Sequence, residues 1–150
     1  MVRGIQSEGI AATPKHFACN NKETNRYESD SVLSERALRE IYLKGFEICI
    51  RESRPRTIMT AYNIINGVRA SENAELITGI LRNEWDFDGL VMSDWDNHAS
   101  HYKETLAGNN IRMPQWTGSD LKEAYEEGKI TRNELAASVK KVLELLLEFE

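Results

Sequence analysis

The sequence predicts an α/β fold in which short parallel strands alternate with amphipathic helices. Apolar runs too short for a helix recur along the chain and are bounded by turn-forming residues. Between these runs, apolar residues return at intervals of three and four, which is the spacing of one helix face. Strands and helices that alternate in this order favour parallel βαβ units.

Three strands are expected from these apolar runs. Residues 9–17 (GIAATPKHF) form the first, a weak strand that leads into a polar loop. Residues 57–62 (TIMTAY) form the second, and the turn-forming pair Asn66-Gly67 follows it. Residues 90–93 (LVMS) form the third, which we expect to be fully buried because its apolar run is continuous. A short fourth strand is expected within residues 105–113.

Four amphipathic helices are expected, at residues 34–52, 76–85, 119–127 and 131–146. Pro55 follows the first of these helices as a stop signal. Thr131 and Glu134 have the spacing of a capping box, which fixes the start of the last helix. The chain therefore holds three or four βα units. A doubly wound sheet closes with that number, whereas a (β/α)₈ barrel needs about 250 residues, so the chain would hold only about half of a barrel.

Length and charge restrict the class of protein. The 150 residues match one domain, and 41% hydrophobic residues suffice for a core. The net charge of −5 argues against a nucleic-acid partner, because no basic stripe is available to neutralise phosphates. No segment is long and apolar enough for a membrane span. The first residues also lack the apolar stretch of a signal peptide, so the cytoplasm is slightly favoured while localisation stays open.

Neither a metal nor a cofactor is expected. Two cysteines, Cys19 and Cys49, are too few for a disulfide framework. Cys49 falls on the apolar face of a predicted helix, so a buried free thiol is expected, with a Cys19–Cys49 bridge as the alternative. No Cys and His spacing suggests a zinc site, and no phosphate-binding glycine loop of the dinucleotide or Walker type is present.

Asp94 is the foremost candidate for chemistry. It follows the strand at residues 90–93 directly, and in parallel α/β folds the carboxyl ends of strands hold the active site. The neighbouring Trp95 would supply a flat apolar ring. The alternative is a helix-capping aspartate in a strand-to-helix loop.

Other polar clusters follow the predicted strands. Lys15 and His16 supply donors for hydroxyl groups, although a lysine ion pair with a satisfied loop histidine is the alternative. Glu23 and Arg26 are spaced to pair with each other and support their loop, and Tyr62 serves as either pocket wall or core. Together with an aromatic platform, these groups suit a neutral polyhydroxylated ligand such as a sugar.

Five motifs occur in one order that resembles the family 3 glycoside hydrolases, the β-glucosidase group. The motifs are KHF at 15–17, NKETNR at 21–26, SERALRE at 34–40, MTAYNIING at 59–67 and GLVMSDW at 89–95. The resemblance covers nearly the whole chain, and several motifs in register make it specific. It implies that the chain is a single partial domain, residues 1–150. That domain is the second half of a TIM-like (β/α)₈ barrel with parallel strands, without the family's second, α/β sandwich domain.

The resemblance also implies roles for individual residues. Asp94 corresponds to the nucleophile that attacks the anomeric carbon, and Lys15 and His16 would donate hydrogen bonds to the sugar. Tyr62 would lie near the nucleophile, with Met59 and Trp95 as pocket walls. The implied reaction is retaining hydrolysis of terminal β-D-glycosyl residues from a β-linked oligosaccharide or glucoside. It needs a second carboxyl group about 5–5.5 Å from the first.

The chain departs from the family in three ways. The motifs begin near the family's mid-barrel, so we expect the first barrel strands to lie outside this sequence, and with them an aspartate and an arginine that grip the sugar. The second domain, which commonly supplies the acid/base, is missing too, and Glu23 and Asp96 are only weak substitutes. Asn110 stands where relatives usually carry an aspartate.

We therefore expect little or no glycosidase activity from the isolated chain. A half-barrel leaves an open sheet edge, so self-association or pairing with a complementary barrel fragment is expected. The competing interpretation is a truncated, non-catalytic carbohydrate-binding or assembly module.

Overall fold

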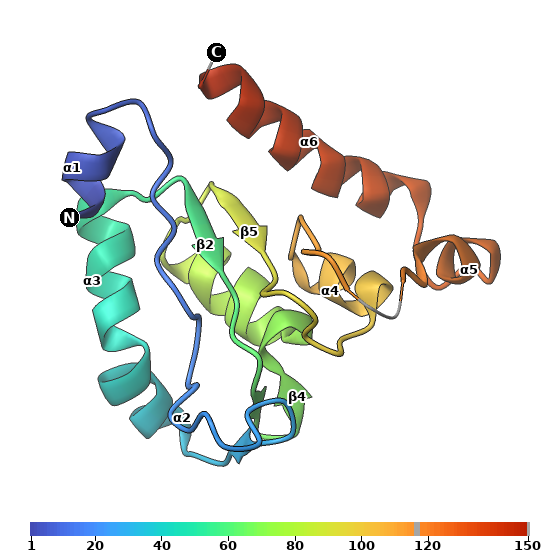
Figure 1. Ribbon diagram of the computed structural model, residues 1–150, viewed down its shortest axis with the longest axis horizontal. Helices are drawn as coiled ribbons and strands as arrows, with labels where there is room; N and C mark the ends of the chain where they lie inside the picture. The colour runs from blue at the N-terminus through green and yellow to red at the C-terminus, as the bar shows by residue number, and fades with distance from the viewer. Residues whose placement is uncertain (116–117, 150) are drawn as a thin grey trace.

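Two parallel strands form the centre of the molecule in the computed structural model, which describes residues 1–115 and 118–149 (Figure 1). Strand β2 (Thr57–Met59) pairs with β5 (Leu90–Met92), so that Ile58 lies opposite Val91. Ile58 and Val91 are both fully buried, as the continuous apolar runs of these strands predict. The expected strand at 90–93 is confirmed, and the expected strand at 57–62 is shorter than predicted.

The segment before β2 lies beside it without forming a regular strand. The Phe17 amide donates to the Met59 carbonyl at 2.8 Å, and the Ala61 amide donates to the Phe17 carbonyl at 2.8 Å. Pro14 has no amide hydrogen, which leaves this short ladder incomplete. The prediction of a strand at 9–17 is therefore wrong, although Phe17 is bridged in parallel to Thr60.

Helices cover the strands where the apolar spacing predicts them. The helix expected at 34–52 is a continuous helical run of α2 (Glu35–Ala37), η1 (Leu38–Tyr42) and α3 (Lys44–Ser53). The helix expected at 76–85 is η3 (Glu75–Glu84), which lies close to the strands in Figure 1. A short helix α1 (Val2–Gln6), which the sequence pattern does not predict, packs near α3.

Phe17 joins the helices to the central strands. Its ring packs edge-on against Phe46 of α3, with ring centroids 5.1 Å apart, and against Trp85, with centroids 6.0 Å apart. The side chain is fully buried among residues of η3 such as Leu76 and Ile77. Phe17, which directly follows Lys15 and His16 in the chain, is therefore fixed in the main core.

A hairpin follows β2 on the side of the strand's carboxyl end. Strand β3 (Ile64–Ile65) pairs antiparallel with β4 (Val68–Arg69) and parallel with β1 (Asp30–Ser31). Asn66 and Gly67 both have positive φ, 48° and 86°, as a two-residue type I′ turn requires. The predicted turn is confirmed, and the short helix η2 (Ala70–Glu72) continues from it.

The fourth strand expected at 105–113 is wrong in its first half. Thr105 to Ala107 form the last turn of helix α4 (His101–Ala107), and Gly108 ends this helix with a φ of 101°. A short segment such as Thr-Leu-Ala does not distinguish a strand from the end of a helix in sequence. Only Ile111 is bridged to β5, in parallel with Met92.

The chain continues through α5 (Leu121–Glu126) and α6 (Arg132–Glu148), which lies at the upper right of Figure 1. The predicted capping box is present, because Thr131 accepts from the Glu134 amide while Glu134 accepts from the Thr131 amide. The apolar face of α6 is not covered by core, and no residue of this helix is buried. Val139, Leu143 and Leu146 are each more than half exposed.

The two cysteines are free thiols, as expected, with Cys19 buried and Cys49 half-buried. Within residues 1–115 and 118–149, no helix combines the length and the apolar character that crossing a membrane requires.

Candidate active site

The carboxyl ends of β2 and β5 open onto a polar site around Asp94. The Asp94 side chain is only 8% exposed, and its Oδ2 lies 3.1 Å from Nε2 of His16. Its other oxygen, Oδ1, accepts the Trp95 amide at 2.8 Å. A buried carboxylate needs such donors, because an unpaired charge is costly away from water.

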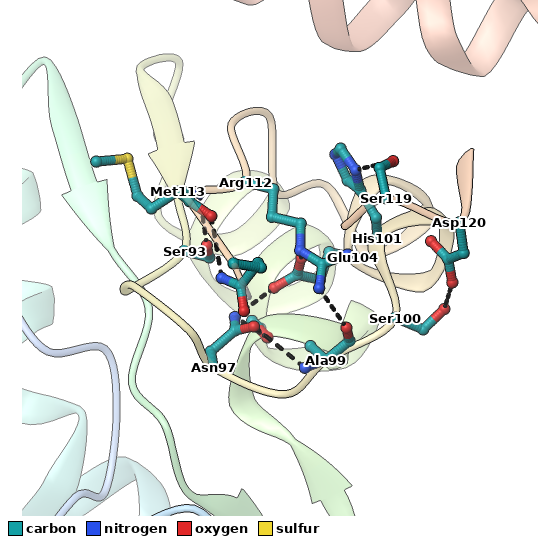
Figure 2. Close-up of polar contacts among 12 residues, drawn as sticks. Ser93, Asn97, Ala99, Ser100, His101, Glu104, Arg112, Met113, Ser119 and Asp120 are labelled. Atoms are coloured by element: carbon teal, nitrogen blue, oxygen red, sulfur yellow. Dashed lines mark hydrogen bonds and ion pairs between the residues drawn. The ribbon is translucent and has the colours of Figure 1, made fainter. Parts of the chain in front are cut away.

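Ser93 fixes the backbone immediately before Asp94. Its hydroxyl donates to the Asp94 carbonyl at 2.9 Å and accepts the Met113 amide at 3.0 Å (Figure 2). The Ser93 amide donates to the Ile111 carbonyl at 2.9 Å. The backbone that carries the candidate nucleophile is therefore tied to the chain segment that returns along β5.

His16 meets Asp94 as a neutral ring. Burial lowers the pKa of His16, and the negative charge of Asp94 opposes this only in part. A neutral imidazole carries one ring proton, which suits a donor beside a carboxylate or a sugar hydroxyl. The adjacent Lys15 is exposed, so its ammonium faces solvent at the edge of the site.

Tyr62 is the second side chain that reaches Asp94. Burial, the charge of Asp94 and a hydrogen bond to Asp94 all raise the pKa of Tyr62 above its usual value. The phenol therefore stays protonated at neutral pH and donates to the carboxylate. Three groups thus converge on Asp94 from separate segments: His16, Tyr62 and the Trp95 amide.

Arg26 packs against the Tyr62 ring and forms an ion pair with Glu23. The Arg26 guanidinium carbon lies 4.2 Å from the centroid of the Tyr62 ring, and its Nη1 is 2.8 Å from Oε2 of Glu23. Hydrogen bonds from Asn20 and Arg26 lower the pKa of Glu23, which is fully exposed. A carboxyl group with a lowered pKa is a poor general acid, so Glu23 does not fit that role.

Tyr27 and His98 belong to the same cluster, although the sequence interpretation missed both. The Tyr27 ring packs edge-on against Tyr62 with centroids 4.8 Å apart, and it stacks on His98 with centroids 4.6 Å apart. His98 has a positive φ of 57°, which is uncommon for a residue other than glycine. No spacing rule predicts this contact, because it joins two loops that are distant in sequence.

The two residues expected as pocket walls differ in exposure. Met59, the last residue of β2, is 5% exposed and belongs to the interior. Trp95 is 47% exposed, and its ring offers a flat apolar surface next to Asp94. Among the residues that the structure describes, no group of three His, Cys, Asp or Glu side chains is arranged to hold a metal ion.

The chain as a whole matches proteins of a known family. Residues 1–145 match the model of the glycosyl hydrolase family 3 N-terminal domain. β-Glucosidase A of Butyrivibrio fibrisolvens is 56% identical over 135 residues, 90% of this chain and 16% of that protein. An exo-α-(1→6)-L-arabinopyranosidase of Bifidobacterium longum is 42% identical over 147 residues, 97% of this chain and 19% of that protein.

Solved structures similar to this fold also include β-glucosidases. The structure of β-glucosidase 3B from Thermotoga neapolitana in complex with glucose aligns with a TM-score of 0.93 and 43% identity, over 98% of this chain and 22% of that one. The prediction of a partial barrel with parallel strands is therefore confirmed, and the doubly wound alternative is wrong. The chain spans only 16% to 22% of the length of these relatives. It belongs to glycoside hydrolase family 3, as a part of that family's N-terminal domain.

Proposed function

We propose that this chain carries the nucleophile and part of the sugar subsite of a retaining β-glycosidase, with Asp94 as the nucleophile. The observation that carries the proposal is the convergence of His16, Tyr62 and the Trp95 amide on one buried carboxylate. A nucleophilic carboxylate must be ionised and held in one orientation, and these three groups serve both needs.

In this proposal Asp94 attacks the anomeric carbon of a β-glycoside and forms a glycosyl-enzyme, while the bond to the leaving oxygen breaks and an activated leaving group departs as its anion. Lys15 donates hydrogen bonds to sugar hydroxyls, and His16 turns its single ring proton from Asp94 to a sugar hydroxyl when the sugar binds. Trp95 packs against the ring or the leaving group. Support for a glucoside comes from the relatives, which include β-glucosidases and a β-glucosidase in complex with glucose.

The proposed chemistry is incomplete in one respect, because neither Glu23 nor Glu104 suits the acid. Glu23 has a lowered pKa and lies in solvent. Burial raises the pKa of Glu104 to about 7, which suits an acid, but Glu104 is fully buried on α4 and faces Asn97. We therefore propose that the chain forms the covalent intermediate only with an activated leaving group, and that its turnover is very slow.

A fluorinated aryl glucoside tests the proposal, because its dinitrophenolate leaves without acid assistance and its fluorine slows hydrolysis of the intermediate. The chain should gain the mass of one sugar, and Asp94→Ala should abolish that gain. Asp96→Ala is the matched control and should still be labelled. Labelling that persists in the Asp94→Ala variant, or no labelling of the folded wild-type chain, would contradict the proposal.

The second candidate is a non-catalytic carbohydrate-binding or assembly module. The exposed Trp95 favours it, since a solvent-facing ring serves sugar binding without chemistry. Calorimetric binding of glucose that survives Asp94→Asn, together with a failure to label, would select this module over the glycosidase.

A further inference from the structure

A buried polar cluster lies behind the loop that carries Asp94, and none of the site residues above belongs to it. Glu104 of α4 is fully buried, and the Arg112 side chain is 6% exposed. Figure 2 shows the two side chains turned toward each other, with Nε of Arg112 3.8 Å from Oε2 of Glu104. Burying a charge costs free energy unless an opposite charge and hydrogen bonds compensate for it. A buried pair such as this one therefore suggests a specific role.

Both members of the pair hold the loop that follows Asp94. The Asn97 amide donates to Oε1 of Glu104 at 2.5 Å and to the Ser71 hydroxyl at 3.2 Å. Arg112 donates from Nη2 to the Ala99 carbonyl at 3.0 Å. The side-chain oxygen of Asn97 accepts the Ala99 amide at 3.1 Å, which links the two contacts.

The same cluster reaches the residue before Asp94. Met113 follows Arg112 in the chain, and its amide donates to the Ser93 hydroxyl, which in turn donates to the Asp94 carbonyl. The loop is thus held before Asp94 through Ser93 and after it through Asn97 and Ala99. Loosening either side would free the Asp94 carboxylate to turn away from His16.

We propose that Glu104 is a positioning residue for Asp94, acting through Asn97 and Arg112 to hold the carboxylate against His16. This inference rests on the proposed function of Asp94 but concerns only its placement. Oε1 of Glu104 accepts from Asn97, whereas Oε2 has no hydrogen-bond partner among the described residues and faces Nε of Arg112 at 3.8 Å. Glu104 is surrounded by the charged groups of Arg112 and Glu72, and burial is the main cause of its raised pKa.

The contact between His16 and Asp94 can be measured without sugar, by NMR titration of the His16 ring. Asp94 raises the pKa of His16, so Asp94→Asn should lower the pKa of His16 in the otherwise wild-type chain. The other charges that face His16 are Lys15, Glu23 and Arg26, and these stay unchanged. A His16→Gln variant identifies the resonance among the three histidines.

The test is whether this Asp94→Asn effect survives in variants of the cluster. In Asn97→Ala and Glu104→Ala backgrounds, the change in the pKa of His16 on Asp94→Asn should fall to less than half, because Asp94 no longer faces His16. Glu104→Gln keeps an acceptor for Asn97 and should retain most of the effect. Thr131→Ala, which removes the distant cap of α6, is the control for a general loss of stability and should retain the full effect.

A full effect in both alanine backgrounds would overturn the proposal, as would the absence of any effect of Asp94→Asn in the wild-type chain. If Glu104→Ala does not fold, Asn97→Ala decides alone, since it leaves no charge unpaired. The result of this NMR test does not depend on whether the fluorinated glucoside labels the chain. A chain that couples His16 to Asp94 through Glu104 but takes no fluorinated sugar would refute the glycosidase function and leave the positioning role intact.

Discussion

Asp94 draws its hydrogen-bonding groups from three segments that lie far apart in sequence. His16 follows the extended segment beside β2, Tyr62 follows β2 itself, and the Trp95 amide follows β5. The effect of a substitution therefore depends on which of these three segments the substituted residue contacts. The residues behind the site, Glu104 and Asn110, provide the most direct tests at this scale.

Glu104 should give the free energy of unfolding a dependence on pH. Its pKa is raised to about 7 in the folded chain, against an ordinary value near 4.5, so between these pH values the folded state binds more protons than the unfolded state. The stability that Glu104 contributes is therefore fully present below pH 4.5 and is lost as the pH rises toward 7.

Glu104→Gln removes this titration. We expect the difference in unfolding free energy, wild type minus variant, to fall by on the order of 2 kcal/mol between pH 4.5 and pH 7.5. Urea unfolding at several pH values measures it, and the subtraction cancels the histidines, which titrate in both proteins. A constant difference across this range would show that Glu104 titrates as it does in water.

Asn110 supports strand β5, which leads to Asp94. Its side-chain oxygen accepts from Arg82 at 2.8 Å and from the Val91 amide of β5 at 3.0 Å. An aspartate here would strengthen both hydrogen bonds and match the charge of Arg82, whose pKa burial lowers. Asn110→Asp should therefore raise the free energy of unfolding by about 1 kcal/mol.

Asn109→Asp is the matched control for this substitution. Asn109 is 2% exposed, and neither of its amide atoms has a hydrogen-bond partner among the described residues. A charge at this neighbouring position has no cation to match it, so the variant should be destabilised. Equal effects of the two substitutions in urea unfolding would contradict the pairing with Arg82.

At the scale of elements, the sequence predicts helices that have a long apolar pattern, and it predicts turns and caps that depend only on neighbouring residues. The helices at 34–52 and 76–85 are predictable because each repeats its apolar spacing over several turns. The turn at Asn66-Gly67 and the cap at Thr131 are predictable because each depends on a few adjacent residues.

Other elements depend on contacts that no local pattern encodes. The run from Thr105 to Ala107 looks like a strand because three residues are too few to distinguish a strand from a helix end. The stacking of Tyr27 on His98 depends on how two loops meet in space. Asp94 itself was predictable because it ends a buried strand, whereas the cluster of Glu104 with Arg112 was not.

The close fit of β2 and β5 also depends on a single small residue. A Cβ atom on Gly89, just before β5, would lie 2.4 Å from the Arg56 carbonyl, which is backbone and has no room to yield. The Leu90 amide donates to this same carbonyl at 2.9 Å. The strand that leads to Asp94 can begin here only because residue 89 has no side chain.

At the scale of the whole molecule, the exposed face of α6 predicts self-association. Val139, Leu143 and Leu146 lie on one stripe of the helix and are 56%, 53% and 58% exposed. A contiguous apolar stripe in water is typical of an interaction surface. Light scattering at micromolar concentration should therefore give a mass above that of one chain.

Leu143→Glu should return the mass to that of a single chain, because it places a charge in the middle of the stripe. Asn133→Glu, which adds the same charge at an exposed position of the first turn, is the control and should leave the association unchanged. A wild-type chain that scatters as a monomer would rule out this role for α6.

The central claim is that Asp94 is the group that reacts with a sugar. The most direct measurement is to treat the folded chain with a fluorinated dinitrophenyl glucoside, digest it and locate the added sugar by mass spectrometry of the peptides. The account predicts one sugar per chain, attached to Asp94 in the peptide that contains Ser93 and Trp95. A sugar on any other residue, or none on the folded chain, would contradict it.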